Sequence, residues 1–214
     1  MSEDILEKQL FEIIQNEELS EDIKLAKIDM LIRLGVNIEA KDDIGWTSLM
    51  YASSNGHREI VELLLEKGGD VEVKNNDGWT PLMYASYNGH SEVVKVLLEN
   101  GADIDVKSIY EENLLMLASE MGHKEVVELL ISRGIDINQK NKNKDTALIM
   151  ASENGYIEVV KLLLENWADI EAKDNRGKTA LDLAENDKVK KMLEDAKKKN
   201  NFLYKIKEGF GMGE

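Results

Sequence analysis

The sequence predicts an all-α protein built as a solenoid of stacked helix-turn-helix repeats with projecting β-turns. The main observation is a self-match at a spacing of 33 residues along most of the chain. A second observation is that each copy contains two short helical patterns, which in most copies are each followed by a glycine. With 43% hydrophobic and 32% charged residues among 214, the composition is that of a folded protein. One such unit cannot bury its apolar face alone, so the copies must stack to form a core.

Residues 1–40 are expected to form an N-terminal helical capping segment. Two helical patterns occur there, over Ile5–Gln15 and Glu21–Leu34, and Ser20 is a plausible N-cap of the second. The sequence rejoins the repeat at Gly35. This segment therefore reads as a degenerate first repeat with a lengthened connection.

Residues 41–196 are expected to hold about five repeats. Three columns recur at the 33-residue spacing: Leu49, Leu82, Leu115, Leu148 and Leu181; Ala52, Ala85, Ala118, Ala151 and Ala184; and Gly56, Gly89, Gly122 and Gly155. The first helix of a copy opens at a threonine that can cap free backbone N–H groups, with Asn113 instead in the third copy. The second helix carries an apolar stripe opposite glutamates, as in REIVELLLE.

The last copy shortens after Ala184, and its second helix is rich in lysine, which suits a polar terminal repeat. Residues 197–214 are expected to form a lysine-rich and aromatic C-terminal tail. Its apolar residues are Phe202, Leu203, Tyr204, Ile206 and Phe210. Three alternatives stay open for this tail: it packs back on the last helix, extends freely, or binds a partner.

The string TPLMYASYNGHSEVVKVLLENGADIDVK, from Thr80 to Lys107, resembles an ankyrin repeat, and the resemblance covers roughly residues 35 to 194. It implies an ankyrin-repeat solenoid that binds proteins on a concave face lined by turn tips and first helices. Some positions depart from the family. The family's histidine is replaced by Met50, Met83, Met116, Ile149 and Asp182. The third copy has Glu111 in place of the turn glycine, and Trp167 replaces a closing glycine.

Composition and motifs argue against several functions. The net charge of −15 disfavours nucleic-acid binding, which needs a basic face. The lysines near the end are read as a solvated helix and tail, with a phosphate- or membrane-contacting tail as the alternative. There is no cysteine, no run of about 20 apolar residues and no signal sequence in MSEDILEKQLFEIIQ, so we expect a cytoplasmic protein with no membrane association.

No catalytic residues, metal site or cofactor are predicted. His57, His90 and His123 occupy one repeat position, and helices packed about 8–10 Å apart do not bring three such rings onto one zinc ion. We expect these rings to be structural, each bonding across its loop. The glutamates of the second helices are expected to form a solvated face, and the ending GFGMG lacks the strand and helix of a dinucleotide loop.

The resemblance implies which positions are exposed to a partner: those beside the turn glycine and before the helix-ending glycine. The candidate partner-binding residues are Ile44, Trp46, Asp77, Trp79, Tyr87, Tyr110, Glu112, Glu120, Met121, Asp145 and Glu153. Trp46 and Trp79 are hypothesised to contact the partner from exposed turn tips, because aromatic residues dominate interface hot spots. The alternative is that both pack on their own turns. The acids favour a partner with basic residues around an apolar centre.

The sequence thus predicts a protein–protein interaction module, acting as an adaptor, scaffold or inhibitor, and expected to be monomeric. Two other hypotheses were considered. One is an enzyme or effector with its activity in the N-terminal segment or the tail, which contain neither histidine nor cysteine. The other is a self-assembling structural protein whose tail aromatics make homotypic contacts.

Overall fold

The computed structural model describes residues 3–209, and the side chains of residues 5–200. All regular structure in this range is helical, and no strand occurs within it, as the sequence predicts. No helix in these residues has the length and apolar character needed to cross a membrane. The chain divides into two compact units, Met1–Ile109 and Tyr110–Glu214.

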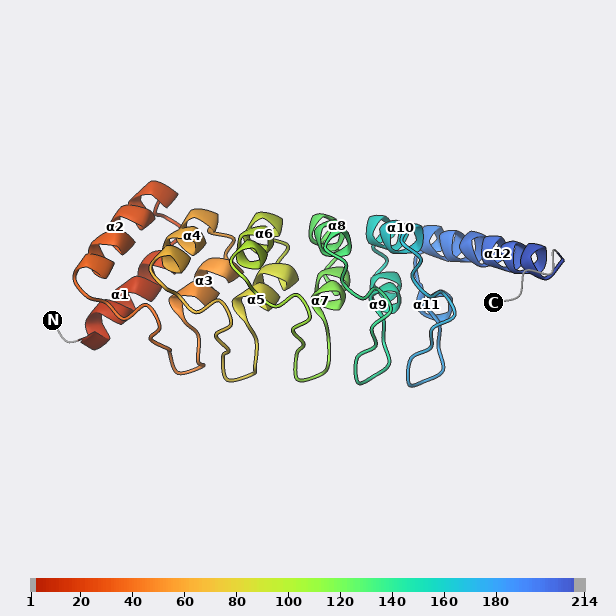
Figure 1. Ribbon diagram of the computed structural model, residues 1–214, viewed down its shortest axis with the longest axis horizontal. Helices are drawn as coiled ribbons and strands as arrows, with labels where there is room; N and C mark the ends of the chain where they lie inside the picture. The colour runs from red at the N-terminus through yellow and green to blue at the C-terminus, as the bar shows by residue number, and fades with distance from the viewer. Residues whose placement is uncertain (1–2, 210–214) are drawn as a thin grey trace. The chain divides into compact units, whose positions relative to one another are not determined.

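The first unit is a stack of three helix pairs (Figure 1). Its helices are α1 (Glu3–Gln15), α2 (Glu21–Arg33), α3 (Ser48–Ser54), α4 (Arg58–Glu66), α5 (Pro81–Tyr87) and α6 (Ser91–Glu99). First helices stack on first helices, α1 on α3 and α3 on α5, while α2 stacks on α4 and α4 on α6. The pair α1–α2 occupies the N-terminal capping segment, so the two helices expected there are confirmed.

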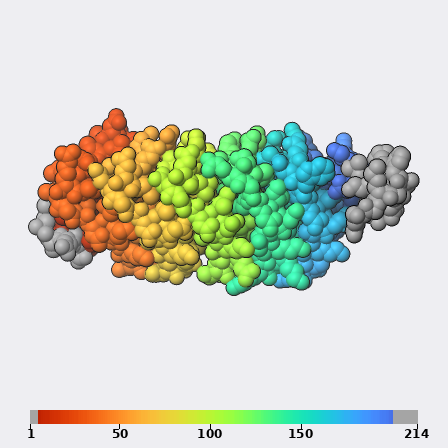
Figure 2. Space-filling view, viewed as in Figure 1, coloured from red at the N-terminus to blue at the C-terminus, as the bar shows by residue number. Residues whose placement is uncertain are grey.

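The second unit repeats this arrangement with three further pairs. Its helices are α7 (Leu114–Glu120), α8 (Lys124–Ser132), α9 (Ala147–Glu153), α10 (Ile157–Glu165), α11 (Ala180–Leu183) and α12 (Asp187–Gly209). α7 stacks on α9 and α9 on α11, while α8 stacks on α10 and α10 on α12. Within each unit the repeats form adjoining bands in the space-filling view (Figure 2), and the turns project beyond the first helices (Figure 1).

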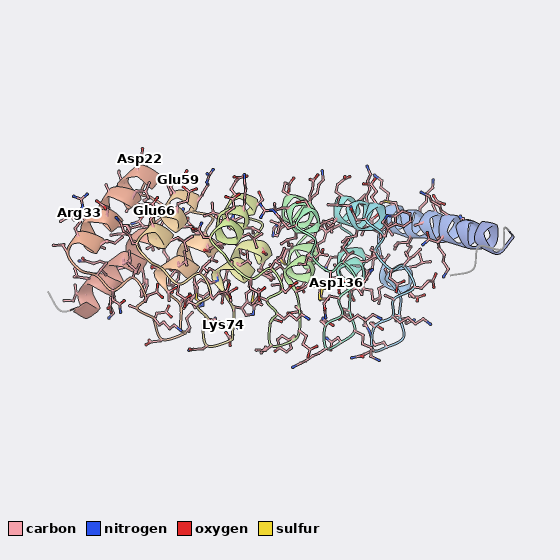
Figure 3. The ribbon with its side chains drawn as sticks, in the orientation of Figure 1. Asp22, Arg33, Glu59, Glu66, Lys74 and Asp136 are labelled. Carbon is pink, nitrogen blue, oxygen red and sulfur yellow. The ribbon has the colours of Figure 1, made fainter. Side chains whose placement is uncertain are left out.

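The recurring apolar columns form the core of each unit. The repeated leucine and alanine of the first helices are almost fully buried in the first four copies, as are the paired β-branched residues of the second helices, such as Val93 and Val94. The opposite face of the second helices is charged and exposed. Asp22, Arg33, Glu59 and Glu66 project into solvent from α2 and α4 (Figure 3).

The capping residues expected for the first helices are confirmed. The hydroxyl oxygens of Thr47, Thr80 and Thr146 each accept a hydrogen bond from a backbone N–H three residues on. In the third copy the Asn113 side chain takes this role, with Met116 N at 2.9 Å. Asp182, which replaces the family's histidine, forms a capping box with Thr179. Ser20 stands at the N-cap of α2, but contrary to expectation its side chain makes no capping bond.

The positions that lack glycine keep the backbone of the glycine they replace. Glu111 has φ +64° and Trp167 has φ +64°, both in the left-handed region that disfavours residues with a Cβ. Lys144, at the turn of the fourth copy, has φ +63°. This third departure was missed in the sequence, although Lys144 lies 33 residues after Glu111.

α12 continues through the position at which a separate tail was expected to begin. It is one helix from Asp187 to Gly209, and it packs on α10 and α11 in the stretch where Val189 and Leu193 are buried. The side chains of the tail's apolar residues from Phe202 onward lie outside the described residues.

Candidate partner-binding surfaces

The turns that carry the candidate residues are fixed by a column of short polar side chains. Asp42 Oδ1 accepts hydrogen bonds from the backbone N–H groups of Ile44 (3.0 Å) and Trp46 (2.8 Å). The same pair of bonds recurs 33 residues later at Asn75, and again at Asn141 and Asp174. A turn held in this way presents its tip in one conformation. This column was not predicted from the sequence, although an Asp, Asn or Ser recurs there at residues 42, 75, 108, 141 and 174.

Neighbouring turns within a unit are also bonded to each other. In the first unit, Asn76 N donates to Ile44 O (3.3 Å) and Asn76 Nδ2 donates to Asp43 O (3.2 Å). In the second, Lys142 N donates to Tyr110 O (2.9 Å). Because backbone groups at successive tips are paired, the tips of one unit form a connected edge.

In the first unit the structure joins three candidate residues into a continuous row of aromatic rings. The row, called the aromatic row below, consists of Phe11, Tyr51, Trp46, Tyr84, Trp79 and Tyr87, in that spatial order. Neighbouring ring centroids lie 4.2 to 5.6 Å apart. These are the separations at which aromatic pairs attract one another. Phe11, Tyr51 and Tyr84 were not among the candidates, although the two tyrosines are 33 residues apart in the repeated string LMYAS.

The expectation that Trp46 and Trp79 stand exposed at the turn tips is wrong in detail. Both indoles are half-buried, because each lies against the tyrosine of its own repeat, and Trp46 also lies against Tyr84 of the next. The exposed tip residue beside them is Ile44, with 54% of its surface accessible. Asp77 is also exposed and lies at the tip of the next turn.

The tyrosine hydroxyls of the aromatic row are held by the polar column. Tyr51 Oη donates to Asp42 Oδ2 at 2.5 Å, and burial together with this carboxylate raises the pKa of Tyr51 far above its usual value. Asn75 Nδ2 donates to Tyr84 Oη at 2.9 Å, and burial raises the pKa of Tyr84 to about 12. The row is therefore neutral and anchored at both of these tyrosines.

In the second unit the structure brings together acidic candidates instead. Burial raises the pKa of Glu120, and the nearby carboxylates of Glu112 and Asp145 raise it further. Burial likewise raises the pKa of Asp145, with additional contributions from Asp174 and Glu153. These five residues are called the acidic cluster below. Arg176 forms a salt bridge with Asp174 at 2.7 Å and approaches Glu153 at 3.9 Å.

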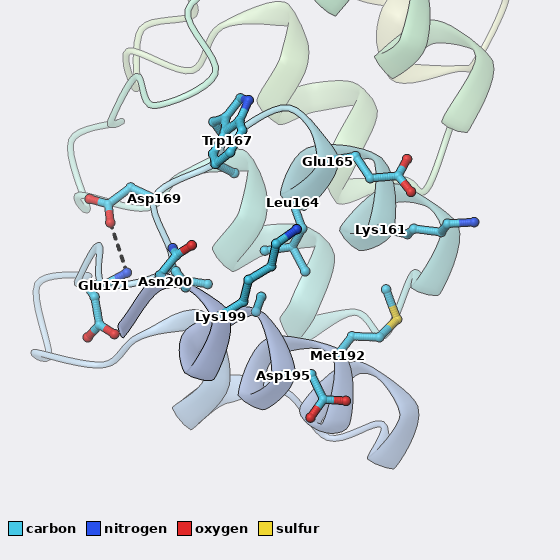
Figure 4. Close-up of a pocket in the computed structure, with 13 residues that line it drawn as sticks. Lys161, Leu164, Glu165, Trp167, Asp169, Glu171, Met192, Asp195, Lys199 and Asn200 are labelled. Carbon is cyan, nitrogen blue, oxygen red and sulfur yellow. Dashed lines mark hydrogen bonds between the residues drawn. The ribbon is translucent and has the colours of Figure 1, made fainter. Parts of the chain in front are cut away.

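The remaining candidates of the second unit are apolar and exposed. Tyr110, 61% accessible, lies at the turn tip of the third copy, and Met121 is exposed after the end of α7. The second unit also contains a hollow of about 570 Å³ beside α10 and α12, with Trp167 among its lining residues (Figure 4). Trp167 is 75% accessible, so its ring is not part of the core.

The repeated histidines join neighbouring repeats. His90 Nε2 lies 2.9 Å from Ser54 O of the preceding repeat, and His57 Nε2 lies 3.1 Å from Ile14 O. Among the described residues no group of three or more His, Cys, Asp or Glu side chains is arranged to hold a metal ion. The structural role predicted for His57 and His90 is confirmed, but their carbonyl partners lie one helix pair earlier rather than in their own loops.

Comparison with known proteins agrees with this architecture. The family model for ankyrin repeats, which describes three copies, matches residues 20–108 and a second time residues 110–202. No curated protein matches the chain.

Proposed function

Because the chain belongs to the ankyrin-repeat family, whose members generally serve as protein–protein interaction modules, we propose that it binds a partner protein through its turn tips and first helices, the concave face in this family. The role would be that of an adaptor, scaffold or inhibitor in the cytoplasm. The observation that carries the proposal is the aromatic row of the first unit, with Ile44 exposed beside it.

The aromatic row suits binding because it is already ordered. Large aromatic side chains contribute most of the energy at many interfaces. Fixing a flexible side chain on association costs about 0.5–1.5 kcal/mol, and rings that pack on one another lose less freedom when a partner arrives. The partly accessible Trp46, Trp79 and Tyr87 thus offer a rigid apolar patch with Ile44 at its margin.

The acidic cluster of the second unit supports a partner that carries basic residues. Burial raises the pKa of Glu120 and Asp145, and neighbouring carboxylates raise it further, so a negative charge is unfavourable at these two residues. Within the chain, the guanidinium of Arg176 already pairs with two carboxylates of the cluster, Asp174 and Glu153. A basic side chain from a partner would relieve the same repulsion at Glu120.

The test starts with capture of the partner by the intact chain, followed by affinity measurements with surface variants. Ile44→Asp and Asp77→Lys change exposed tip residues without removing a ring of the aromatic row. Glu66→Lys, on the solvated face of α4, is the matched control because it makes the same charge change as Asp77→Lys.

We expect Ile44→Asp to weaken binding at least about tenfold with an unchanged melting curve, because it places a charge in an apolar contact. Asp77→Lys should slow association with a basic partner. Equal affinity of both tip variants and the control would exclude the turn-tip surface of the first unit.

A further inference from the structure

A second apolar surface lies on the α1–α2 pair, away from the aromatic row. It is a groove of about 510 Å³ between the two helices. Its apolar lining residues are Leu6, Ile13, Leu19, Met30, Leu31 and Leu34. Met30, in the last turn of α2, and Leu34, its C-cap, are 62% and 53% accessible, which is unusual for two neighbouring large apolar residues.

The groove does not belong to the stacking face of the pair. α1 contacts the next pair through Phe11, whose ring lies 5.5 Å from Tyr51, and α2 through Lys24 and Glu21, which reach His57. At 100° per residue, Leu6 and Ile13 lie on the opposite side of α1 from Phe11. The groove is therefore uncovered within the described residues, while the stacking face is already occupied by α3 and α4.

The helix pair that forms this groove is acidic as a whole. Residues 3–34 contain nine acidic and four basic residues. Of the four bases, Lys24 is almost fully buried and bonded to Ile14 O, and Arg33 is paired with Asp29 at 2.7 Å. The groove lining itself holds one acid, Glu12, and one base, Lys27, so the excess of carboxylates belongs to the helix pair around it.

Among the helices of the described residues, only α12 contains more basic than acidic residues. Residues 187–209, the span of α12, contain eight lysines and four acidic residues. The helix is anchored on α10 and α11 by its first part and is continuous to Gly209. The sequence of its last part, FLYKIK, combines apolar residues with lysines. An apolar and basic helical segment is complementary to an apolar groove on an acidic helix pair.

We propose that the α1–α2 groove of one molecule binds the C-terminal segment of α12, residues 201–209, from a second copy of this chain. The contact joins two different surfaces, so each bound molecule keeps one free groove and one free segment. Such head-to-tail contacts produce rings or open chains rather than dimers of fixed size. The proposal is independent of the partner-binding surface, because no groove residue belongs to the aromatic row or the acidic cluster.

The experiment measures the mass of the full chain in solution over a series of concentrations and salt concentrations. We expect the mean mass to rise with protein concentration beyond that of a dimer, and to fall when salt is added, because salt screens the charge attraction. The double variant Met30→Lys/Leu34→Lys should weaken self-association at least about tenfold, since it removes two apolar contacts and adds positive charges that repel Lys205 and Lys207. Ile23→Lys is the matched control on the same helix, because Ile23 is 47% accessible and does not line the groove.

Two changes on the other side of the contact complete the test. Deleting residues 201–214 leaves Val189 and Leu193 in place, and Lys205→Glu/Lys207→Glu keeps the full-length chain; both should abolish assembly. Mixing the groove variant with the deletion variant should restore one contact and yield a complex of two chains. A monomeric intact chain at every concentration, or assembly that persists in both the groove variant and the deletion variant, would overturn the proposal.

Discussion

Replacing Trp46 by alanine tests whether the rings of the aromatic row pack on one another or are independent and exposed. A fully buried aromatic truncated to alanine costs about 3–5 kcal/mol of stability. The Trp46 indole is half-buried, and it contacts Tyr51 at 4.8 Å and Tyr84 at 4.2 Å. Each aromatic pair contributes about 0.5–1.5 kcal/mol beyond burial. We therefore expect Trp46→Ala to lower the free energy of unfolding by about 2–3 kcal/mol.

The assay is urea unfolding followed by circular dichroism at the helical signal, which does not depend on the removed indole. Ile44→Ala is the control on the same turn, because exposed substitutions change stability by about 0.5 kcal/mol or less. A double-mutant cycle between Trp46 and Tyr84 should give a coupling of about 0.5–1.5 kcal/mol. A loss below about 0.5 kcal/mol for Trp46→Ala, together with no coupling, would refute the packed row.

Four further predictions follow from individual residues. Trp167→Gly should raise the free energy of unfolding by about 1–2 kcal/mol, because Trp167 combines a left-handed backbone with a solvent-exposed ring; a lower denaturation midpoint would show that the indole stabilises the fold. Glu111→Gly should stabilise the fold by a similar amount, because Glu111 also has a left-handed backbone. In the unmodified chain, backbone amides near residues 109–121 should exchange faster than those near 80–97; equal protection would show that the Asn113 cap offsets the strain at Glu111. Burial and the nearby Lys24 lower the pKa of His57 below 6.5 in the folded state, although Glu21 opposes this shift, so the unfolded chain takes up the proton first as pH falls. The contribution of His57 to stability should therefore be complete above about pH 6.5 and decrease as pH falls towards the folded pKa. His57→Gln should reduce this pH dependence in denaturation measured at several pH values. Glu120 has a raised pKa, so its charge is unfavourable at pH 7, and Glu120→Gln should increase stability at pH 7 by a few tenths of a kcal/mol, with no gain below the carboxyl's usual pKa.

The sequence alone predicts the helix pairs well because the repeat is a local signal. Thr47, Gly56 and the apolar stripe of α4 each specify one feature of the chain within a few residues. Even the copies that lack glycine keep the expected backbone, since stacking against neighbouring copies imposes it on Glu111 and Trp167. The fold is thus overdetermined by many short-range signals that agree.

The candidate surfaces were harder to predict because they depend on contacts between copies. That Trp46 is half-buried follows from Tyr84, which is 38 residues away in the sequence and belongs to the next repeat. The sequence of a single copy does not indicate this contact. It becomes predictable only when the recurrence of the tyrosine at residues 51 and 84 is considered together with the position of Trp46 in the turn. The raised pKa of Glu120 likewise depends in part on Asp145, which belongs to the next copy.

The polar column at Asp42, Asn75, Asn141 and Asp174 has a consequence for how such a protein can change its specificity. The side chain of each column residue holds the backbone on both arms of its turn, so apart from the turn glycine the fold of the tip depends little on the intervening side chains. Tip residues such as Ile44 and Asp77 can consequently be exchanged one turn at a time while the scaffold is retained. Natural divergence, or deliberate substitution of the tip residues, would then change which partner is bound while the helical framework stays the same.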